Sequence, residues 1–121
     1  MTASPSAGPE PTAGRHSRAA LSVLTFGRGP ETDQALWARL FRQARCADSG
    51  VDADQWFPVS TTAESAAAEA AVALAVCQSC QVRSLCLALS LLHWDVGQHG
   101  VWGGLVAADR ANLRRQLLEG A

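Results

Sequence analysis

Three of the four cysteines lie in one ten-residue stretch, CQSCQVRSLC at residues 77–86, and this stretch decides how the chain folds. The fourth, Cys46, precedes Cys77 with 30 residues between them. A chain of 121 residues built from short helices has a small hydrophobic core, and a group bound by several thiols would stabilise it. We therefore predict that Cys46, Cys77, Cys80 and Cys86 meet at one centre that joins the surrounding helices.

Several kinds of centre are compatible with this spacing. Thiolates bind zinc and iron–sulfur clusters equally well by their softness. Structural zinc sites usually combine two short-spaced ligand pairs, whereas this chain has one such pair, Cys77 and Cys80. Three close cysteines with one distant cysteine also occur among iron–sulfur proteins. The spacing therefore leaves an iron–sulfur cluster and zinc open, with a redox-active dithiol of Cys77 and Cys80 as a third interpretation.

The composition limits the class of protein. The length is that of one domain, 48% of the residues are apolar, and ten basic residues oppose eleven acidic ones for a formal charge of −1. This balance excludes a large multidomain enzyme and a chain held on nucleic acid by its overall charge. Because no apolar run reaches the roughly 18 to 20 residues of a membrane span and no convincing export signal occurs, we expect a cytoplasmic protein with reduced thiols.

The sequence divides into an N-terminal leader and one domain. Residues 1–31 contain four of the five prolines and few large apolar side chains, so we predict a disordered leader there and a folded domain over 32–121. Apolar periodicity and cap signals predict helices over 32–45, 61–77, 81–94 and 107–118. No segment alternates as a strand does. We therefore predict an all-α fold, a small bundle of about four short helices around the four-cysteine site.

Finer features accompany these helices. The first has an apolar stripe made of Leu36, Trp37, Leu40, Phe41 and Ala44, and the second begins at a capping box, TTAE at residues 61–64. The loop at 47–60 presents two adjacent aromatic residues before Pro58, and a glycine-rich loop follows the third helix. We expect Trp37 and Trp94 to pack in the core, and we interpret His93 and His99 as ordinary helix-end or loop residues.

Together these motifs resemble the WhiB-like proteins of actinobacteria. The resemblance covers about residues 35–118 and rests on Cys46, DADQWFP at 52–58, CQSC at 77–80, Cys86 and GVWGG at 100–104. It implies a [4Fe-4S] cluster bound by all four cysteines. It further implies a role in transcription through the C-terminal domain of the primary sigma factor of RNA polymerase. Clusters of this family react with nitric oxide and often with oxygen, so the implied input is redox or gas sensing.

The resemblance also implies a partner-facing surface. Its aromatic members would be Trp102, Trp56 and Phe57, and the wider set of candidates is Trp56, Phe57, Pro58, Gly100, Val101, Trp102, Gly103 and Gly104. Aromatic side chains in glycine-framed loops bury a large area at small entropic cost, which suits an interface. The alternative interpretation is that the tryptophans cover the cysteine site and exclude water from it.

Other functions remain open at this stage. Many family members carry a basic tail that contacts DNA, whereas here only Arg110, Arg114 and Arg115 follow the glycine loop. A weak DNA contact through them is one interpretation and a solvated helix face is the other, so promoter contact is expected mainly through sigma and polymerase. The alternative functions are a metal-free disulfide reductase that uses Cys77 and Cys80, and a zinc-stabilised adaptor.

Overall fold

The computed structural model describes residues 32–120, so the predicted leader at 1–31 lies outside the described part of the chain. That part forms helices joined by turns and contains no strand, although Trp102 and Leu105 form an isolated antiparallel bridge. The predicted all-α fold is confirmed. The helices are, in order, α2 (Asp33–Gln43), the 3-10 helix η1 (Arg45–Asp48), α3 (Ala53–Trp56), α4 (Ala63–Glu69), α5 (Ala71–Gln78), α6 (Arg83–Leu92), α7 (Trp94–Gly97) and α8 (Ala107–Gly120).

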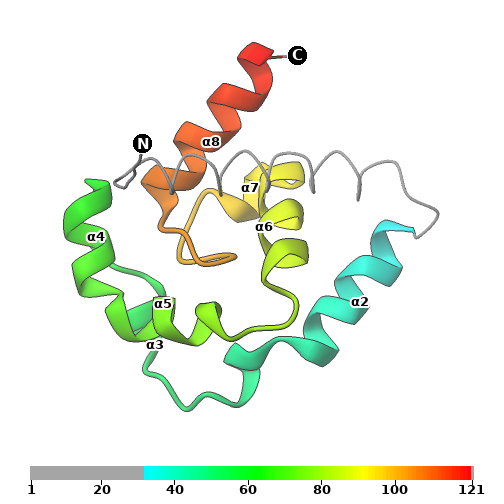
Figure 1. Ribbon diagram of the computed structural model, residues 1–121, viewed down its shortest axis with the longest axis horizontal. Helices are drawn as coiled ribbons and strands as arrows, with labels where there is room; N and C mark the ends of the chain where they lie inside the picture. Colours follow the sequence, from blue (N-terminus) through cyan, green and yellow to red (C-terminus); the bar gives the residue numbers. More distant parts are fainter. Residues whose placement is uncertain (1–31, 121) are drawn as a thin grey trace, which may run out of the picture.

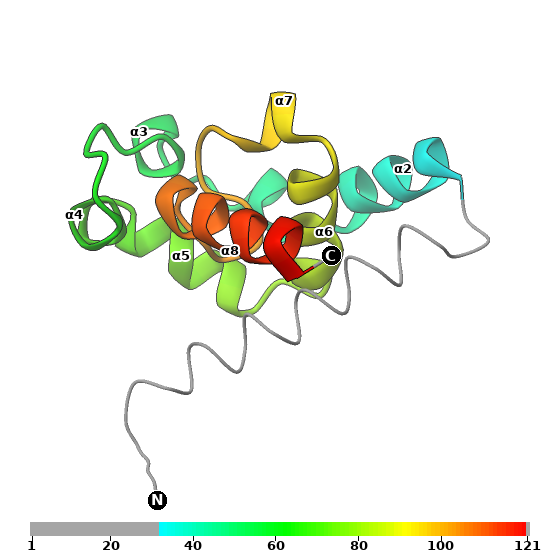
Figure 2. The ribbon, with the colours of Figure 1, turned by 90° about the horizontal axis from the view of Figure 1, so that it is seen from above.

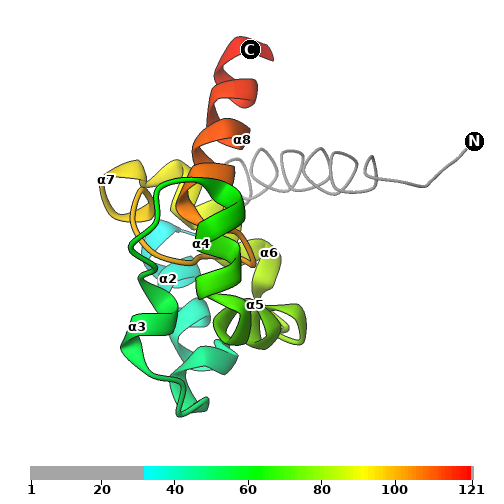
Figure 3. The same cartoon turned by 90° about the vertical axis from the view of Figure 1, so that its left-hand side faces the viewer.

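Helix α6 lies between the two ends of the molecule, and six of its ten residues are buried. Figures 1 and 2 place α2 and α4 at opposite ends with α6 between them. Helices α2 and α7 contact α6, whereas η1, α3 and α4 contact α5. Figure 3 shows the C-terminal half of α8 projecting beyond the other helices. No single helix of residues 32–120 is long and apolar enough to cross a membrane; α5 and α6 meet that criterion only jointly, as a pair bent by 116°.

The helix predicted over 32–45 divides into α2 and η1. Thr32 caps α2 by accepting a hydrogen bond from the backbone N–H three residues on, at 3.1 Å. Leu36 and Leu40 are buried against residues of α6. Helix α2 ends before Ala44, whose backbone is extended, and η1 then carries Cys46 without burying any of its own residues.

The helix predicted over 61–77 is also two helices. The N-cap of α4 is Thr62, whose hydroxyl accepts a hydrogen bond from the N–H of Ser65 at 3.4 Å. The reciprocal half of the predicted capping box is not formed. The helix breaks at Ala70, which is fully buried beside Val106. An alanine-rich sequence gives no local signal for this break.

Gln55 of α3 satisfies the start of α5. The break leaves the first N–H groups of α5 without helical partners, and the side-chain oxygen of Gln55 accepts from Val72 at 3.0 Å and from Ala73 at 3.4 Å. This contact ties α3 to α5. It therefore fixes the position of Trp56, the last residue of α3.

The helix predicted over 81–94 ends earlier, and α7 follows it after His93. Gly97 at the end of α7 packs directly on the backbone of α6, where a Cβ atom would overlap the carbonyl group of Ser90. Ser90 is itself fully buried, and its hydroxyl donates to the carbonyl oxygen of Leu87 at 2.7 Å. This close approach turns the chain back, so that the glycine loop returns along α6.

Candidate functional site

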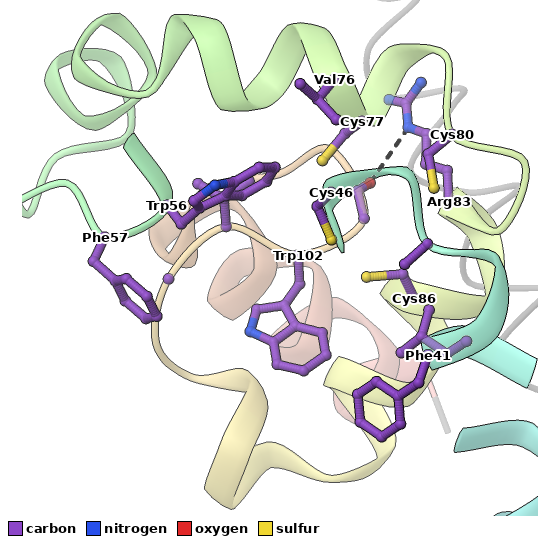
Figure 4. A pocket seen from close by; sticks show the side chains of 15 residues that line it. Phe41, Cys46, Trp56, Phe57, Val76, Cys77, Cys80, Arg83, Cys86 and Trp102 are labelled. Atoms are coloured by element: carbon purple, nitrogen blue, oxygen red, sulfur yellow. Dashed lines mark hydrogen bonds between the residues drawn. The ribbon is translucent and has the colours of Figure 1, made fainter. Parts of the chain in front are cut away.

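All four cysteines line one apolar pocket of about 360 Å³ (Figure 4). Cys46 comes from η1, Cys77 from the end of α5, Cys80 from the turn that follows, and Cys86 from α6. Figure 4 shows the sulfur atoms of Cys46, Cys77 and Cys86 pointing toward a common space. The pocket is lined by Leu40, Phe41, Ala44, Cys46, Trp56, Phe57, Val76, Cys77, Cys80, Arg83, Cys86, Gly100, Val101, Trp102 and Gly103. The fold thus brings together thiols that lie far apart in the sequence.

The four thiols differ in exposure, and none forms a disulfide. Cys77 is buried, Cys80 and Cys86 are partly buried, and Cys46 is exposed at the mouth of the pocket. The backbone N–H of Arg45 donates to the sulfur of Cys80 at 3.4 Å, which links η1 to the turn after α5. Each sulfur therefore has its own protein environment within one shared pocket.

The glycine turn forms the wall of the pocket beside Cys77 and Cys86. Gly103 and Gly104 both have left-handed backbones, with φ of 59° and 83°. Gly103 lines the pocket, and a Cβ atom there would lie 2.5 Å from that of Leu87. Successive N–H groups in such a turn create a concave site for negative charge, an arrangement known from phosphate and iron–sulfur sites.

Burial dominates the electrostatics of the thiols. It raises the pKa of Cys46 and Cys77 above the ordinary value of 9.0, and it raises the pKa of Cys86 to about 12. The backbone N–H groups of Gly104 and Gly103 act against burial and lower the pKa of Cys77 and Cys86, respectively, whereas the neighbouring cysteines raise both pKa values further. The thiolate forms therefore need a compensating positive charge inside the pocket, which a bound metal centre would supply.

The donor set fits an iron–sulfur cluster. Four thiols in one apolar pocket are the ligands that such clusters use. A single zinc ion binds sulfur at about 2.3 Å and so requires the ligands to converge on one point. No three His, Cys, Asp or Glu side chains of residues 32–120 are grouped that tightly. The four thiols line a pocket of about 360 Å³.

Aromatic residues from two loops adjoin the pocket. The backbone N–H of Val101 donates to the carbonyl oxygen of Trp56 at 2.9 Å, so the loop after α3 and the glycine loop are joined. Phe57 packs over Gly100, where a Cβ atom would lie 2.8 Å from a ring carbon. The ring of Phe57 is nevertheless 61% exposed. Trp56 and Phe57 therefore adjoin the glycine loop beside the pocket, with Pro58 partly buried next to them, whereas Gly103 is buried against Leu87.

Trp102 is held on two sides. Its indole N–H donates to the carbonyl oxygen of His99 at 3.0 Å, and its ring meets Trp37 edge-on with centroids 6.1 Å apart. Trp37 also stacks on Phe41 at 5.8 Å. Phe41, which belongs to the apolar stripe of the first predicted helix, is 68% exposed and lines the pocket.

The histidines and the other tryptophan lie away from the pocket. His93 pairs with Asp33 at 2.8 Å between Nε2 and Oδ2, and its ring lies 5.4 Å from that of Trp37, tilted by 54°. Trp94 packs against a buried group formed by α6 and α8. His99 takes part through its backbone carbonyl group, as described for Trp102. Arg83, which sequence patterns did not single out, lines the pocket and donates to the carbonyl oxygen of Gly103 at 3.3 Å.

The three candidate DNA-contacting arginines lie in different environments. Arg110 is fully buried, so the expectation that it faces DNA or solvent is wrong. Its guanidinium group is needed inside the fold, where it binds backbone carbonyl groups. Arg114 lies over the ring of Trp94 at 5.1 Å, and Arg115 is exposed and bonded to Asn112. Two partly engaged arginines leave little basic surface on α8.

Comparison with known proteins places this pocket in a family context. Residues 41–113 match the model of a family described as transcription factor WhiB. The chain is 32% identical over 115 residues to the transcriptional regulator WhiB2 of Mycolicibacterium smegmatis, which covers 92% of the chain and 77% of the relative. It is 38% identical over 77 residues to the transcriptional regulator WhiB1 of Bifidobacterium longum, covering 63% of the chain and 77% of the relative. No solved structure matches the chain.

Proposed function

The chain belongs to the WhiB family of transcription factors, and from this premise we propose that it is a cytoplasmic transcription regulator with an iron–sulfur cluster at its four cysteines. The observation that carries the proposal is the single apolar pocket lined by Cys46, Cys77, Cys80 and Cys86. A [4Fe-4S] cluster bound there supplies a centre that reacts with nitric oxide or oxygen. The four thiolates hold it, and burial controls access to it.

We propose that the partner is the C-terminal domain of the primary sigma factor. The surface at the pocket mouth supports this, because Phe57 and Phe41 expose large aromatic areas that a soluble monomer does not need. Trp102 is half-buried and oriented by two contacts, so a partner could bind it without ordering it first. The few basic residues available on α8 favour promoter contact through sigma and polymerase over direct DNA binding.

The pocket and the docking surface share residues, which suggests how the input reaches the partner. Trp102 lines the pocket and also belongs to the proposed docking surface. Gly103 lines the pocket beside it. A change at the sulfurs therefore acts on the same turn that carries Trp102. Loss of the cluster is expected to weaken sigma binding by releasing this turn.

Anaerobic co-expression with the sigma C-terminal domain tests the proposal. We expect a coloured complex that contains iron and acid-labile sulfide in equal amounts. Phe57→Ala and Trp102→Ala should each weaken sigma binding at least tenfold, because central aromatic residues dominate interface energies. Leu118→Ala is the matched control, since this apolar residue is 62% exposed but lies on α8. Stoichiometric zinc in place of iron, or unchanged binding by both aromatic variants, contradicts the proposal.

The alternative functions have less support. A reductase needs a thiol that ionises readily, as found at helix N-termini. Cys77 instead lies at the C-terminal end of α5, and burial raises its pKa. A zinc-stabilised adaptor requires the cysteines to converge on one ion, and the thiols line an extended pocket instead. The relatives are named transcriptional regulators, which agrees with a protein that is not an enzyme.

A further inference from the structure

Arg110, near the start of α8, is a fully buried charged residue directed at backbone rather than at a carboxylate. Its Nε and Nη2 atoms donate to the carbonyl oxygen of Gly97 at 3.0 and 2.7 Å. Nη1 donates to the carbonyl oxygen of Leu105 at 2.6 Å, and Nη2 also donates to that of His99 at 3.0 Å. The guanidinium group therefore binds both ends of the loop that connects α7 to α8.

These bonds close the loop around the side chain. Gly97 and His99 lie at its beginning and Leu105 at its end, and Trp102 and Leu105 are further joined by backbone hydrogen bonds of 3.1 and 3.2 Å. Arginine is suited to this position, because its planar group directs several donors at once. A lysine has one nitrogen and cannot reach three carbonyl groups in the same way. The loop conformation thus depends on the shape of the arginine as well as on its charge.

The other side of the same loop faces the cysteines. Val101, Trp102 and Gly103 line the pocket together with the four cysteines. The conformation that Arg110 stabilises is therefore the one that forms this wall of the pocket.

The charge of Arg110 has no salt-bridge partner among residues 32–120. Burying an unpaired charge is unfavourable unless negative charge lies close to it. Burial lowers the pKa of Arg110 to about 10, an effect that negative charge on Cys86 and Asp109 opposes. The hydrogen bonds to backbone carbonyl groups are therefore the contacts that hold the buried guanidinium group in place.

We propose that Arg110 is a positioning residue for the cysteine pocket: it holds the 97–105 loop so that Val101, Trp102 and Gly103 cover Cys77 and Cys86. This role follows from the geometry of the loop and does not depend on a bound cluster.

The proposal is tested by alkylating the reduced, metal-free, full-length protein with iodoacetamide. Mass spectrometry follows the alkylation rate of each cysteine. Arg110→Lys should raise the rates at Cys77 and Cys86 at least tenfold, because the loop no longer covers them. Cys46 is the internal control, since it is already exposed, and its rate should change less than twofold. Arg42→Lys, at an exposed arginine of α2, should change none of the rates.

Two results overturn the proposed loop contacts. One is rates at Cys77 and Cys86 within twofold of the unmodified protein. The other is equal acceleration at all four thiols together with a loss of helical circular dichroism, which would mean that Arg110 supports the whole fold and not this loop. Neither result depends on a bound cluster, so a colourless protein without iron contradicts the proposed function and leaves this measurement decisive.

Discussion

At the scale of single residues, Gly103 of the pocket wall should tolerate substitution less well than Gly50, a turn glycine in open space. Gly103 and Gly50 both have left-handed backbones, with φ of 59° and 69°. A Cβ atom at Gly50 would meet nothing within 4 Å, whereas one at Gly103 would lie 2.5 Å from the Cβ of Leu87 and 2.7 Å from its backbone. The two positions therefore separate backbone strain from steric overlap.

Gly103→Ala should destabilise the metal-free protein by about 3 kcal/mol or more, because it adds overlap with α6 to the backbone strain. Gly50→Ala should cost only about 1 to 2 kcal/mol, the strain alone. Denaturant unfolding followed by circular dichroism measures both values. Equal losses at the two positions would mean that the contact between the turn and Leu87 is not tight.

Single residues also mark the limit of sequence reasoning at the site. The four cysteines and the aromatic residues of the two loops could be identified because their spacing is distinctive. The burial of Arg110 could not, because amphipathic patterns assign arginine to solvent. This assignment fails because tertiary contacts of the glycine loop determine the environment of the residue.

At the scale of helices, Gln55 and Glu69 connect the proposed docking surface to α4 and α5, and α5 carries Cys77. Helix α5 ends in Cys77, and its first turn is bonded by Gln55, which precedes Trp56. Glu69 at the end of α4 accepts hydrogen bonds from the N–H groups of Val59 and Ser60 at 3.0 and 3.2 Å. The loop between α3 and α4 is therefore attached at both ends to the α4–α5 pair.

Gln55→Ala should cost about 1 kcal/mol of folding free energy, because two N–H groups at the start of α5 lose their acceptor. The same change should speed hydrogen exchange at Val72 and Ala73. Gln116→Ala, at an exposed position of α8, is the control and should have little effect on either quantity. Unchanged exchange at both amides would show that water replaces the side chain without loss.

Helix type was easier to predict than helix bounds. Apolar spacing identified all four predicted helical regions, since each buries one face. The break at Ala70 could not be predicted, because an alanine-rich sequence gives no local signal for it. The separation of η1 from α2 left no mark in the sequence either, because it arises from the placement of Cys46. The short helix α3 lay inside a segment predicted as a loop.

At the scale of the whole molecule, the core of residues 32–120 consists of three separate groups of buried side chains. One joins α2 to α6, one joins α6 to α8, and one joins α4 to the segment before α8. Cys80 and Cys86 pack against the first group. Because η1 buries none of its residues, a bound cluster would be the main attachment of Cys46 to the rest of the fold.

Removal of the cluster should therefore detach η1 from the rest of the fold before other helices loosen. We expect trypsin to cleave after Arg42 and Arg45 at least tenfold faster in the metal-free protein than in the loaded protein. Cleavage after Arg115 on α8 should change less than twofold, because this exposed site lies outside the pocket. Timed digestion with mass spectrometry measures the three rates. Uniform acceleration at all of them would instead indicate global unfolding.

The residues common to the pocket wall and its outer surface have an evolutionary consequence. Trp102 lines the pocket, and under the proposed function it also contacts the partner. A substitution there would then change both gas access and partner affinity, so selection on one trait would also act on the other. Under the same proposal, paralogues that diverge in one trait are expected to have diverged in the other.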